Sequence, residues 1–221
     1  MKRLLVLRPQ PGASATAERA RSLGLDPALI PLFEIEPLEW TAADPAGFDA
    51  LLLTSANAVR FGGDELKSLL PLPVHAVGAA TAEAACEAGF RVSSVGEAGV
   101  DALLDSLDPK LNLLHLGGDH RKAPGAARQA IRSIAVYRSH EIEAPDVGEA
   151  GDAVALIHSP RSGARFAQLV RDRGSIAIAA ISQAAAQAAG TGWQRVEWAS
   201  RPNDDALLAL AAELCNNLSG T

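Results

Sequence analysis

Short, continuous apolar runs recur along the whole chain, and stretches rich in alanine separate them. Runs without alternation are typical of parallel strands that are covered on both faces. Two of the alanine-rich stretches, residues 14–23 and 79–88, are followed by Gly24 and Gly89, which predicts helices that end at a glycine. The pattern therefore indicates an α/β protein. The predicted strands are 4–9, 28–33, 50–55, 74–78 and 91–96 in the first half, and 112–118, 134–139, 153–159, 176–182 and 195–200 in the second.

The second half of the sequence repeats the first. When residues 50–104 are laid over 154–208 without a gap, Ser55 meets Ser159 and one Asp-Ala-Leu-Leu run meets another. The earlier parts match after a small insertion, so the copies span roughly 1–107 and 111–211. Units of this length indicate two duplicated domains and exclude a solenoid, whose repeats run to ~20–50 residues. The repeat alone does not distinguish a tandem arrangement from one that exchanges segments between the domains.

The composition of the chain argues against several classes of function. Of the 221 residues, 48% are hydrophobic and 21% are charged, which is enough to bury a core. The net charge of −6 argues against a nucleic-acid partner. Cys86 and Cys215 lie far apart in helical patterns, which indicates free thiols and no zinc site. The apolar run after the first residues is too short for a signal peptide, and no stretch is long enough to span a bilayer, so we expect a cytoplasmic protein.

Candidate ligand-binding groups follow the predicted strands. In open parallel sheets, ligands bind beyond the carboxyl ends of the strands, where loops lead into helix N-termini that hold anions well. Most of these loops carry a hydroxyl, an amide or a guanidinium. An alternative for Ser55 and Ser159 is that they only cap helices. Asp101 and Asp204 begin helical patterns, where we expect each carboxylate to accept backbone N–H groups.

Sequence signatures of common catalytic and cofactor sites are missing from the chain. The histidines show no metal-ligand spacing, and we predict no metal site and no cofactor. His75, His115 and His158 lie within apolar strands, where a histidine that is hydrogen-bonded in the core is the commoner outcome. His120 stands apart because it lies in the polar loop Gly-Gly-Asp-His-Arg-Lys.

Eight segments in this order resemble the uroporphyrinogen-III synthase family, over essentially the whole chain. They are Arg-Pro after the first strand, PLFEIEP, FDALLLTSANAVR, VHAVGAATAEAACEAGF, LLHLGGDHR, IAVYRS, ALIHSPRSGARF, and a late AIAAIS that is followed by Trp193, Val196 and Ala199. The resemblance implies a cofactor-free lyase that cyclises hydroxymethylbilane, a linear tetrapyrrole, to uroporphyrinogen III, with inversion of the last pyrrole ring and loss of water.

The resemblance also implies an architecture. Two flavodoxin-like parallel-sheet domains of similar topology are joined by a two-strand linker, and the active-site cleft lies between them. Transferred to this chain, domain 1 comprises residues 1–34 plus 144–221 and domain 2 comprises 39–135. The linker strands are then 35–38 and 136–143.

Tyr137, the single tyrosine of the chain, matches the family's tyrosine at the end of its strand, which implies a role as the catalytic acid. A neutral phenol, whose usual pKa is about 10, can donate a hydrogen bond to the leaving hydroxyl across physiological pH. The alternative is a tyrosine that only packs and hydrogen-bonds locally. The substrate's acetate and propionate groups imply further residues that bind carboxylates. These substrate-binding candidates are Arg8, Ser55, Asn57, Thr81, Arg121, Arg138, Ser159, Arg161 and Ser182.

One segment departs from the family pattern. Residues 182–185 read Ser-Gln-Ala-Ala where many members carry threonines, so Ser182 is the least secure of the candidates. The rival function is a two-lobed protein that binds a small anion without turnover; a structural protein would lack the candidate groups. We expect a monomer that contacts the preceding enzyme of its pathway only transiently.

Overall fold

The computed structural model describes residues 2–120, 127–147 and 151–217. Its chain forms two compact units, each with its own sheet and its own core. Unit 1 comprises Met1–Glu34 and His140–Thr221, and unit 2 comprises Ile35–Ser139. Unit 1 is therefore built from both ends of the chain, and unit 2 from its middle.

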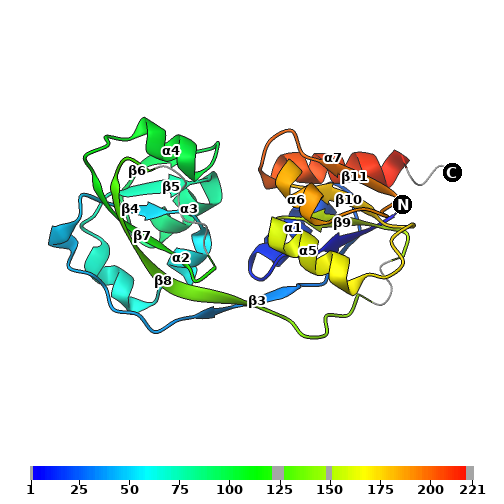
Figure 1. Ribbon diagram of the computed structural model, residues 1–221, viewed down its shortest axis with the longest axis horizontal. Coiled ribbons are helices and arrows are strands. Elements are labelled where there is room, and N and C mark those ends of the chain that lie inside the picture. The colour runs from blue at the N-terminus through cyan, green and yellow to red at the C-terminus, as the bar shows by residue number, and fades with distance from the viewer. Residues whose placement is uncertain (1, 121–126, 148–150, 218–221) are drawn as a thin grey trace. The chain divides into compact units, whose positions relative to one another are not determined.

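Unit 1 contains a five-stranded parallel sheet in the order β11-β10-β9-β1-β2 (Figure 1). The apolar runs predicted as strands are buried on both faces, because neighbouring residues of one strand serve different cores. In β1, for example, Leu5 packs with one core and Leu4 and Val6 pack with the other. The strands are β1 (Arg3–Val6), β2 (Pro27–Leu29), β9 (Ala153–Ile157), β10 (Ala177–Ala180) and β11 (Arg195–Trp198).

Four helices cover the two faces of this sheet (Figure 1). Helices α1 (Gly12–Ser22) and α7 (Asp204–Asn217) pack on one face, and α5 (Pro160–Leu169) and α6 (Gln183–Ala188) on the other. Helix α1 ends where predicted, since Gly24 has a φ of 75° that other residues rarely adopt.

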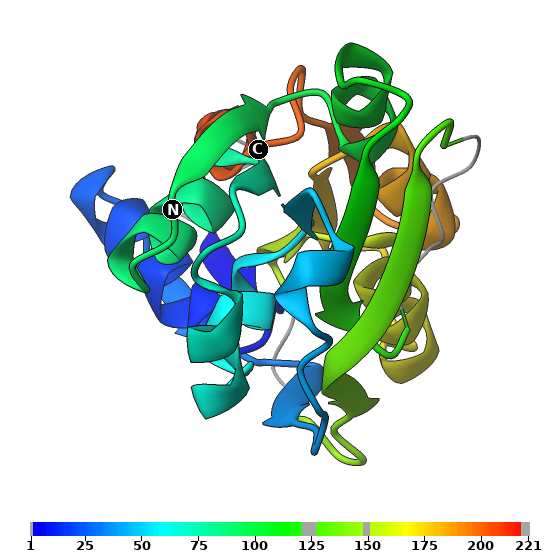
Figure 2. The same ribbon diagram turned by 90° about the vertical axis from the view of Figure 1, so that its left-hand side faces the viewer.

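Unit 2 contains a six-stranded sheet in the order β3-β8-β7-β4-β5-β6. Its buried leucines and valines pack under α2 and α3 on one face and under α4 on the other. Figure 2 shows β8 as a long, continuous strand of this sheet. The elements are β3 (Phe33–Pro37), β4 (Ala50–Leu53), β5 (Val74–Val77), β6 (Val92–Gly96), β7 (Asn112–Gly118), β8 (Ala130–Glu141), α2 (Ala56–Arg60), α3 (Ala79–Glu87), α4 (Val100–Ser106) and the 3-10 helices Pro45–Gly47 and Asp64–Leu69.

The two sequence copies exchange strands between the units. Strands β1 and β2 of the first copy join β9, β10 and β11 of the second, while β7 and β8 of the second copy join β4, β5 and β6 of the first. When the count in unit 1 starts at β1 and that in unit 2 starts at β7, with β4 to β6 counted after β8, both sheets have the order 2-1-3-4-5 of flavodoxin-like folds. The sheet of unit 2 has β3 as an additional edge strand. The predicted fold class, two parallel-sheet α/β domains of similar topology, is confirmed.

Strands β3 and β8 carry the chain between the units and pair with each other. The backbone N–H of Ile142 donates to Leu32 and that of Leu38 donates to Val136, each over 3.0 Å. From the first pair to the second, the residue number rises in one strand, from 32 to 38, and falls in the other, from 142 to 136, so the two strands are antiparallel.

The strand predicted over residues 28–33 is interrupted. Strand β2 ends at Leu29 and β3 begins at Phe33. Between them Ile30 N–H still donates to Val6, the last residue of β1, over 3.0 Å, and Leu32 N–H donates to Leu7, directly after β1, over 3.1 Å. Pro31 has no N–H with which to continue the pattern, so the regular strand ends there. Of the helices that the structure describes, none has the length and apolarity needed to cross a membrane.

Candidate functional site

The loops after β1 and β9 lie next to each other at the carboxyl end of the sheet in unit 1. These strands pair in parallel, with Val6 opposite Leu156. The strand order reverses at this pair, because β1 is followed by β2 on one side and β9 by β10 on the other. Such a reversal is where open α/β sheets bind ligands. It places Arg8 and His158, which follow the two strands, at one end of the sheet.

A carboxylate from α7 joins this end of the sheet to α1. Asp204 accepts a hydrogen bond from His158 Nε2 over 2.8 Å and another from the hydroxyl of Thr16 over 2.8 Å. The Nη1 atom of Arg8 lies 3.5 Å from the carboxylate, and Arg19 of α1 forms an ion pair with its second oxygen. We call these five residues the Asp204 cluster.

The charges of the Asp204 cluster follow from burial and from the neighbouring donors. Burial alone would raise the pKa of Asp204, but the hydrogen bond from His158, the hydroxyl of Thr16 and the charge of Arg8 outweigh it and hold the pKa at about 2. Burial lowers the pKa of His158, whose side chain is 8% exposed. The carboxylate is therefore ionised and the imidazole neutral near pH 7. Its Nε2 carries the proton that it donates to Asp204.

The side chain of Arg8 lies over the first residue of α1. A Cβ atom built on Gly12 would come within 2.6 Å of Arg8 Nε and 2.9 Å of Nη2. The guanidinium occupies the space that any larger residue at position 12 would need. Gly12 therefore allows Arg8 to reach Asp204, and no pattern in the sequence indicated this contact.

The other candidates of unit 1 begin two neighbouring helices. Ser159 caps α5, where it accepts a hydrogen bond from Ser162 N–H over 3.1 Å in a reciprocal capping box. Ser182 caps α6 and accepts from Ala185 N–H over 3.3 Å. The predicted capping role of Ser159 is thus present. The exposed Arg161 lies with its guanidinium 4.5 Å from the centre of the Phe33 ring.

In unit 2, Ser55, Asn57 and Thr81 lie at the corresponding ends of β4 and β5. Ser55 caps α2 by accepting from Asn57 N–H over 3.2 Å, and Thr81 is buried in the first turn of α3. Ser55 thus has the predicted capping role. Neighbouring Thr54 is 3.0 Å from Nε2 of the buried His115, which confirms that this histidine is hydrogen-bonded in the core.

Tyr137 lies on β8 beside Gly118 of β7. A Cβ atom at Gly118 would lie 2.8 Å from Cε2 of the tyrosine ring and 3.2 Å from its hydroxyl. The ring also lies 6.4 Å from that of Phe61, at an interplanar angle of 43°. Among the described residues, none hydrogen-bonds to the phenolic hydroxyl. Within that part of the chain, the half-buried ring is therefore held by packing alone.

Of the two remaining arginines among the predicted binding residues, the structure describes Arg138. Arg138 forms an ion pair with Glu36 of the adjacent β3, with Nη2 2.7 Å from the carboxylate, and its side chain is 55% exposed. Arg121 lies outside the described residues. His120 is exposed, with Nε2 3.9 Å from the carboxylate of Asp119.

The prediction that Asp204 caps its own helix was wrong. Asn203 takes that role by accepting a hydrogen bond from Ala206 N–H over 2.9 Å, which leaves the Asp204 carboxylate to the four side chains around it. Sequence reasoning missed Thr16, Arg19 and the link between His158 and Arg8. Thr16 and Arg19 stand three residues apart on α1 and so share a helix face, but nothing in the sequence identified their partner.

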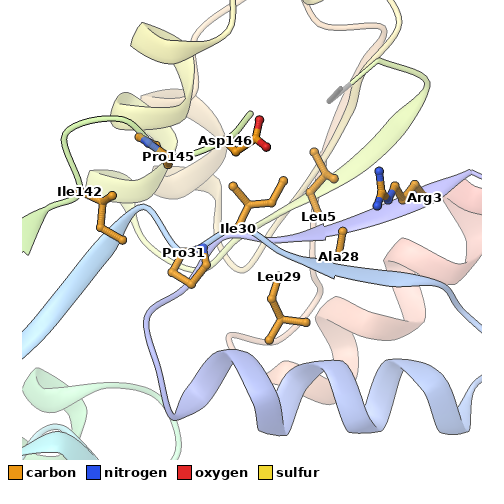
Figure 3. Close-up of a pocket in the computed structure, with 9 residues that line it drawn as sticks. All are labelled: Arg3, Leu5, Ala28, Leu29, Ile30, Pro31, Ile142, Pro145 and Asp146. Atoms are coloured by element: carbon orange, nitrogen blue, oxygen red, sulfur yellow. The ribbon is translucent and has the colours of Figure 1, made fainter. Parts of the chain in front are cut away.

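A groove of about 670 Å³ lies elsewhere in unit 1, along the edge strand β2 (Figure 3). Figure 3 shows a mainly apolar lining with Arg3 and Asp146 as its charged members, while Leu29 points toward α1. None of the predicted site residues that the structure describes lines this groove. Among the described residues, no three His, Cys, Asp or Glu side chains gather in a group that could hold a metal ion.

Comparisons with known proteins agree on one family. No curated protein matches the sequence. The uroporphyrinogen-III synthetase of Helicobacter pylori 26695 has a similar structure, with a TM-score of 0.65 and 18% identity over 97% of this chain and 100% of that one. A mutant uroporphyrinogen III synthase of the extremely thermophilic bacterium Thermus thermophilus gives a TM-score of 0.55 and 20% identity, over 97% of this chain and 99% of that one. These likenesses support the fold. The model of the family uroporphyrinogen-III synthase HemD matches residues 14–209, so the chain belongs to that family.

Proposed function

We propose that this protein cyclises hydroxymethylbilane to uroporphyrinogen III, with inversion of the last pyrrole ring and loss of water. The observation that carries the proposal is the family match over residues 14–209. The missing signatures of nucleophilic and cofactor-dependent catalysis fit this chemistry, because the reaction needs mainly a weak acid and a strong constraint on geometry.

Tyr137 is the proposed acid. The phenol donates its proton to the departing hydroxyl of the substrate as the carbon–oxygen bond breaks, and the hydroxyl leaves as water. The pyrrole nitrogen of the substrate stabilises the cation that remains, so the acid need give only modest help. The support is the packing of the Tyr137 ring against Gly118 and Phe61, which holds the phenol in a defined position.

Positioning is the larger task. The free substrate closes to the isomer without inversion, so the enzyme must hold the chain folded for attack at the substituted carbon of the last ring. Such positioning can contribute up to about 7–11 kcal/mol. We assign it to contacts with the substrate's carboxylates, made by helix N-termini and arginines. The proposed binding residues are Arg8, Ser55, Asn57, Thr81, Arg121, Arg138, Ser159, Arg161 and Ser182.

The proposal extends to the setting of the protein. We propose a cytoplasmic monomer that acts on a linear tetrapyrrole polycarboxylate, meets the preceding pathway enzyme only transiently and binds no nucleic acid. The net charge of −6 does not oppose an anionic substrate, since local arginines and helix N-termini can outweigh a distant acidic surface.

An isomer assay tests the proposed function. The protein is incubated with enzymatically generated hydroxymethylbilane, the products are oxidised, and the uroporphyrin isomers are separated by chromatography. We expect isomer III in excess of the spontaneous product. Isomer I alone, at the rate seen without protein, would exclude turnover and leave an anion-binding protein as the better description.

A further inference from the structure

The Asp204 cluster brings two arginines of unit 1 to the two oxygens of one carboxylate. We propose that Asp204 is a positioning residue that holds Arg8 and Arg19 together as a subsite for one carboxylate of the substrate. This inference rests on the proposed function, and it assigns roles to Arg19, Thr16, His158 and Asp204.

The position of the Asp204 carboxylate is fixed independently of the arginines. His158 Nε2 and the hydroxyl of Thr16 each donate a hydrogen bond to it over 2.8 Å. His158 directly follows β9, and Thr16 is fully buried in α1, so both donors stand on rigid elements. With its side chain 11% exposed, Asp204 is largely shielded from water and has little freedom to turn away.

The arginines, in contrast, reach the solvent. Their side chains are 33% exposed at Arg8 and 47% at Arg19. Within the Asp204 cluster, the positive charges of two guanidinium groups face one carboxylate, and His158 is neutral. Asp205 offsets little of this charge, since it lies 3.5 Å from Arg19 alone and is 85% exposed. A carboxylate is the group that such a pair binds best, through charge-assisted hydrogen bonds.

The place in the fold agrees with a binding role. The cluster joins the loops after β1 and β9, where the strand order reverses, to Thr16 in the middle of α1, Arg19 in its last turn and Asp204 in the first turn of α7. Arg8 lies against the first residue of α1, whose first turn carries no acidic side chain. The Arg8 guanidinium therefore lies beside the positive end of a helix of 11 residues.

The competing interpretation is that Asp204 merely neutralises the arginines. The two interpretations predict opposite signs for Asp204→Asn, a change that keeps the shape of the side chain and removes its charge. If Asp204 only competes with a ligand anion, its neutralisation strengthens substrate binding and lowers KM. If Asp204 positions the arginines, KM rises despite the added positive charge.

The first test is steady-state kinetics of Asp204→Asn with hydroxymethylbilane. We expect KM to rise about tenfold, the size expected for losing one charge-assisted hydrogen bond, while kcat changes less than about twofold. The matched control is Asp205→Asn, which removes the same charge from the same helix turn and should leave KM unchanged. An unchanged or lowered KM in Asp204→Asn overturns the proposal.

A second variant tests Arg8 without touching the carboxylate. Gly12→Ala puts a methyl group where the Arg8 guanidinium now lies, and the flexible side chain must move away. Alanine suits a helix, so we expect an unchanged melting temperature together with a raised KM. This variant decides the question if Asp204→Asn does not fold, and an unchanged KM in Gly12→Ala contradicts the subsite.

A binding measurement separates failure of this inference from failure of the proposed function. Uroporphyrin, which carries the same acetate and propionate groups, is titrated against the wild type, Asp204→Asn and Asp205→Asn, with its fluorescence as the signal. Wild-type protein that forms no isomer III would refute the proposed function alone. Equal dissociation constants for wild type and Asp204→Asn would refute the subsite alone.

Discussion

At the scale of single residues, Tyr137 combines a fixed ring with a hydroxyl that no described residue hydrogen-bonds. Gly118 leaves room for the ring and Phe61 packs beside it, so the position of the phenol is set by neighbours with no charge of their own. Removal of the hydroxyl should therefore affect chemistry far more than folding.

Tyr137→Phe should lower kcat by about 10- to 100-fold, near the lower end for general acids, because the substrate's own nitrogen shares the cation. The free energy of unfolding should change by less than about 0.5 kcal/mol, since the hydroxyl has no partner among the described residues. The isomer assay and urea unfolding measure the two effects. Full activity in this variant would remove the phenol from the mechanism.

A second aromatic substitution in unit 2 provides the control for Tyr137→Phe. Trp40 Nε1 donates a hydrogen bond to the carbonyl of Gly62 over 2.8 Å. Trp40→Phe loses this bond and should lower stability by about 1 kcal/mol or more while the isomer assay stays unchanged.

The pH dependence of stability should report on Asp204. Its pKa of about 2 in the folded protein lies below the usual 3.8, so the carboxylate stabilises the fold above pH 3.8, and this contribution is lost as the pH falls toward 2. The contribution amounts to about 2 kcal/mol. His158 acts in the same direction from pH 6.5 downward, because burial lowers its pKa and the unfolded chain takes up the proton more readily.

The measurement for Asp204 is the unfolding free energy of wild type and Asp204→Asn between about pH 4 and pH 2. The difference between the two proteins should shrink by about 2 kcal/mol as the pH falls. Asp205→Asn is the control and should give a curve parallel to the wild type. If the curve for Asp204→Asn ran parallel to that of the wild type, the four neighbours of the carboxylate would not lower its pKa in the folded protein.

At the scale of elements, the helices after β9 and β10 are packed unusually closely. A Cβ atom at Gly163 of α5 would lie 2.8 Å from the carbonyl oxygen of Ala185 and 3.0 Å from the backbone nitrogen of Ala189. Both neighbours are backbone atoms of, or next to, α6, and they cannot turn aside as a side chain would. This contact sets the spacing of two helices whose first turns carry Ser159 and Ser182.

Gly163→Ala should therefore lower the free energy of unfolding by about 1–3 kcal/mol, as overpacking does in other cores. Gly174→Ala is the control in the same unit, because its new methyl group would meet only the carboxylate of Asp172, at 3.9 Å. Urea unfolding compares the two. Equal stabilities would show that α5 and α6 can separate without cost.

At the scale of the whole molecule, each unit buries its own hydrophobic residues. The cores of unit 2 are drawn entirely from residues 35–139, and those of unit 1 entirely from the remaining chain. The chain crosses between the units twice, and the two crossings pair as β3 and β8. Unit 2 is thus inserted between β2 and β9 of unit 1, which β1 separates in the sheet, and its two ends lie close together because β3 and β8 pair.

Residues 35–139 expressed alone should fold and unfold cooperatively, because this segment contains a whole sheet and both of its covering layers. Circular dichroism and urea unfolding measure this. A fragment of residues 35–129 is the control: it lacks β8 and leaves β7 as an unpaired edge, so it should not unfold cooperatively. A molten 35–139 fragment would show that unit 2 depends on the rest of the chain.

Much of the fold could be predicted from the sequence because the signals were local. Continuous apolar runs mark strands that are buried on both faces, and Gly24 and Gly89 mark helix ends, both with a positive φ. The interruption of the strand at Pro31 was not predicted, because the apolar pattern continues through this residue although its backbone has no N–H. The repeat revealed two copies but not their exchange, since self-similarity contains no information about which strands pair.

The candidate site was harder to predict because its contacts are distant in sequence. Asp204 meets Arg8, Thr16 and His158 only once the sheet has formed, and read alone it resembles a helix cap. Arg138 was predicted as an anion-binding group, and its cross-strand ion pair with Glu36 depends on a register that no local pattern specifies.

The pairing of β1 with β9 also sets the order in which the two units can fold during synthesis. Residues 35–139 leave the ribosome as a complete unit, while β1 and β2 must wait until Ala153–Ile157 has been made. Leu4, Leu5 and Val6 are fully or almost fully buried in the final sheet, so during this interval they lack β9, one of their two partner strands, and expose apolar side chains that favour aggregation. Unit 2 can therefore fold first. Until β9 has been made, we expect a chaperone to bind the nascent chain at the exposed apolar residues 4–6.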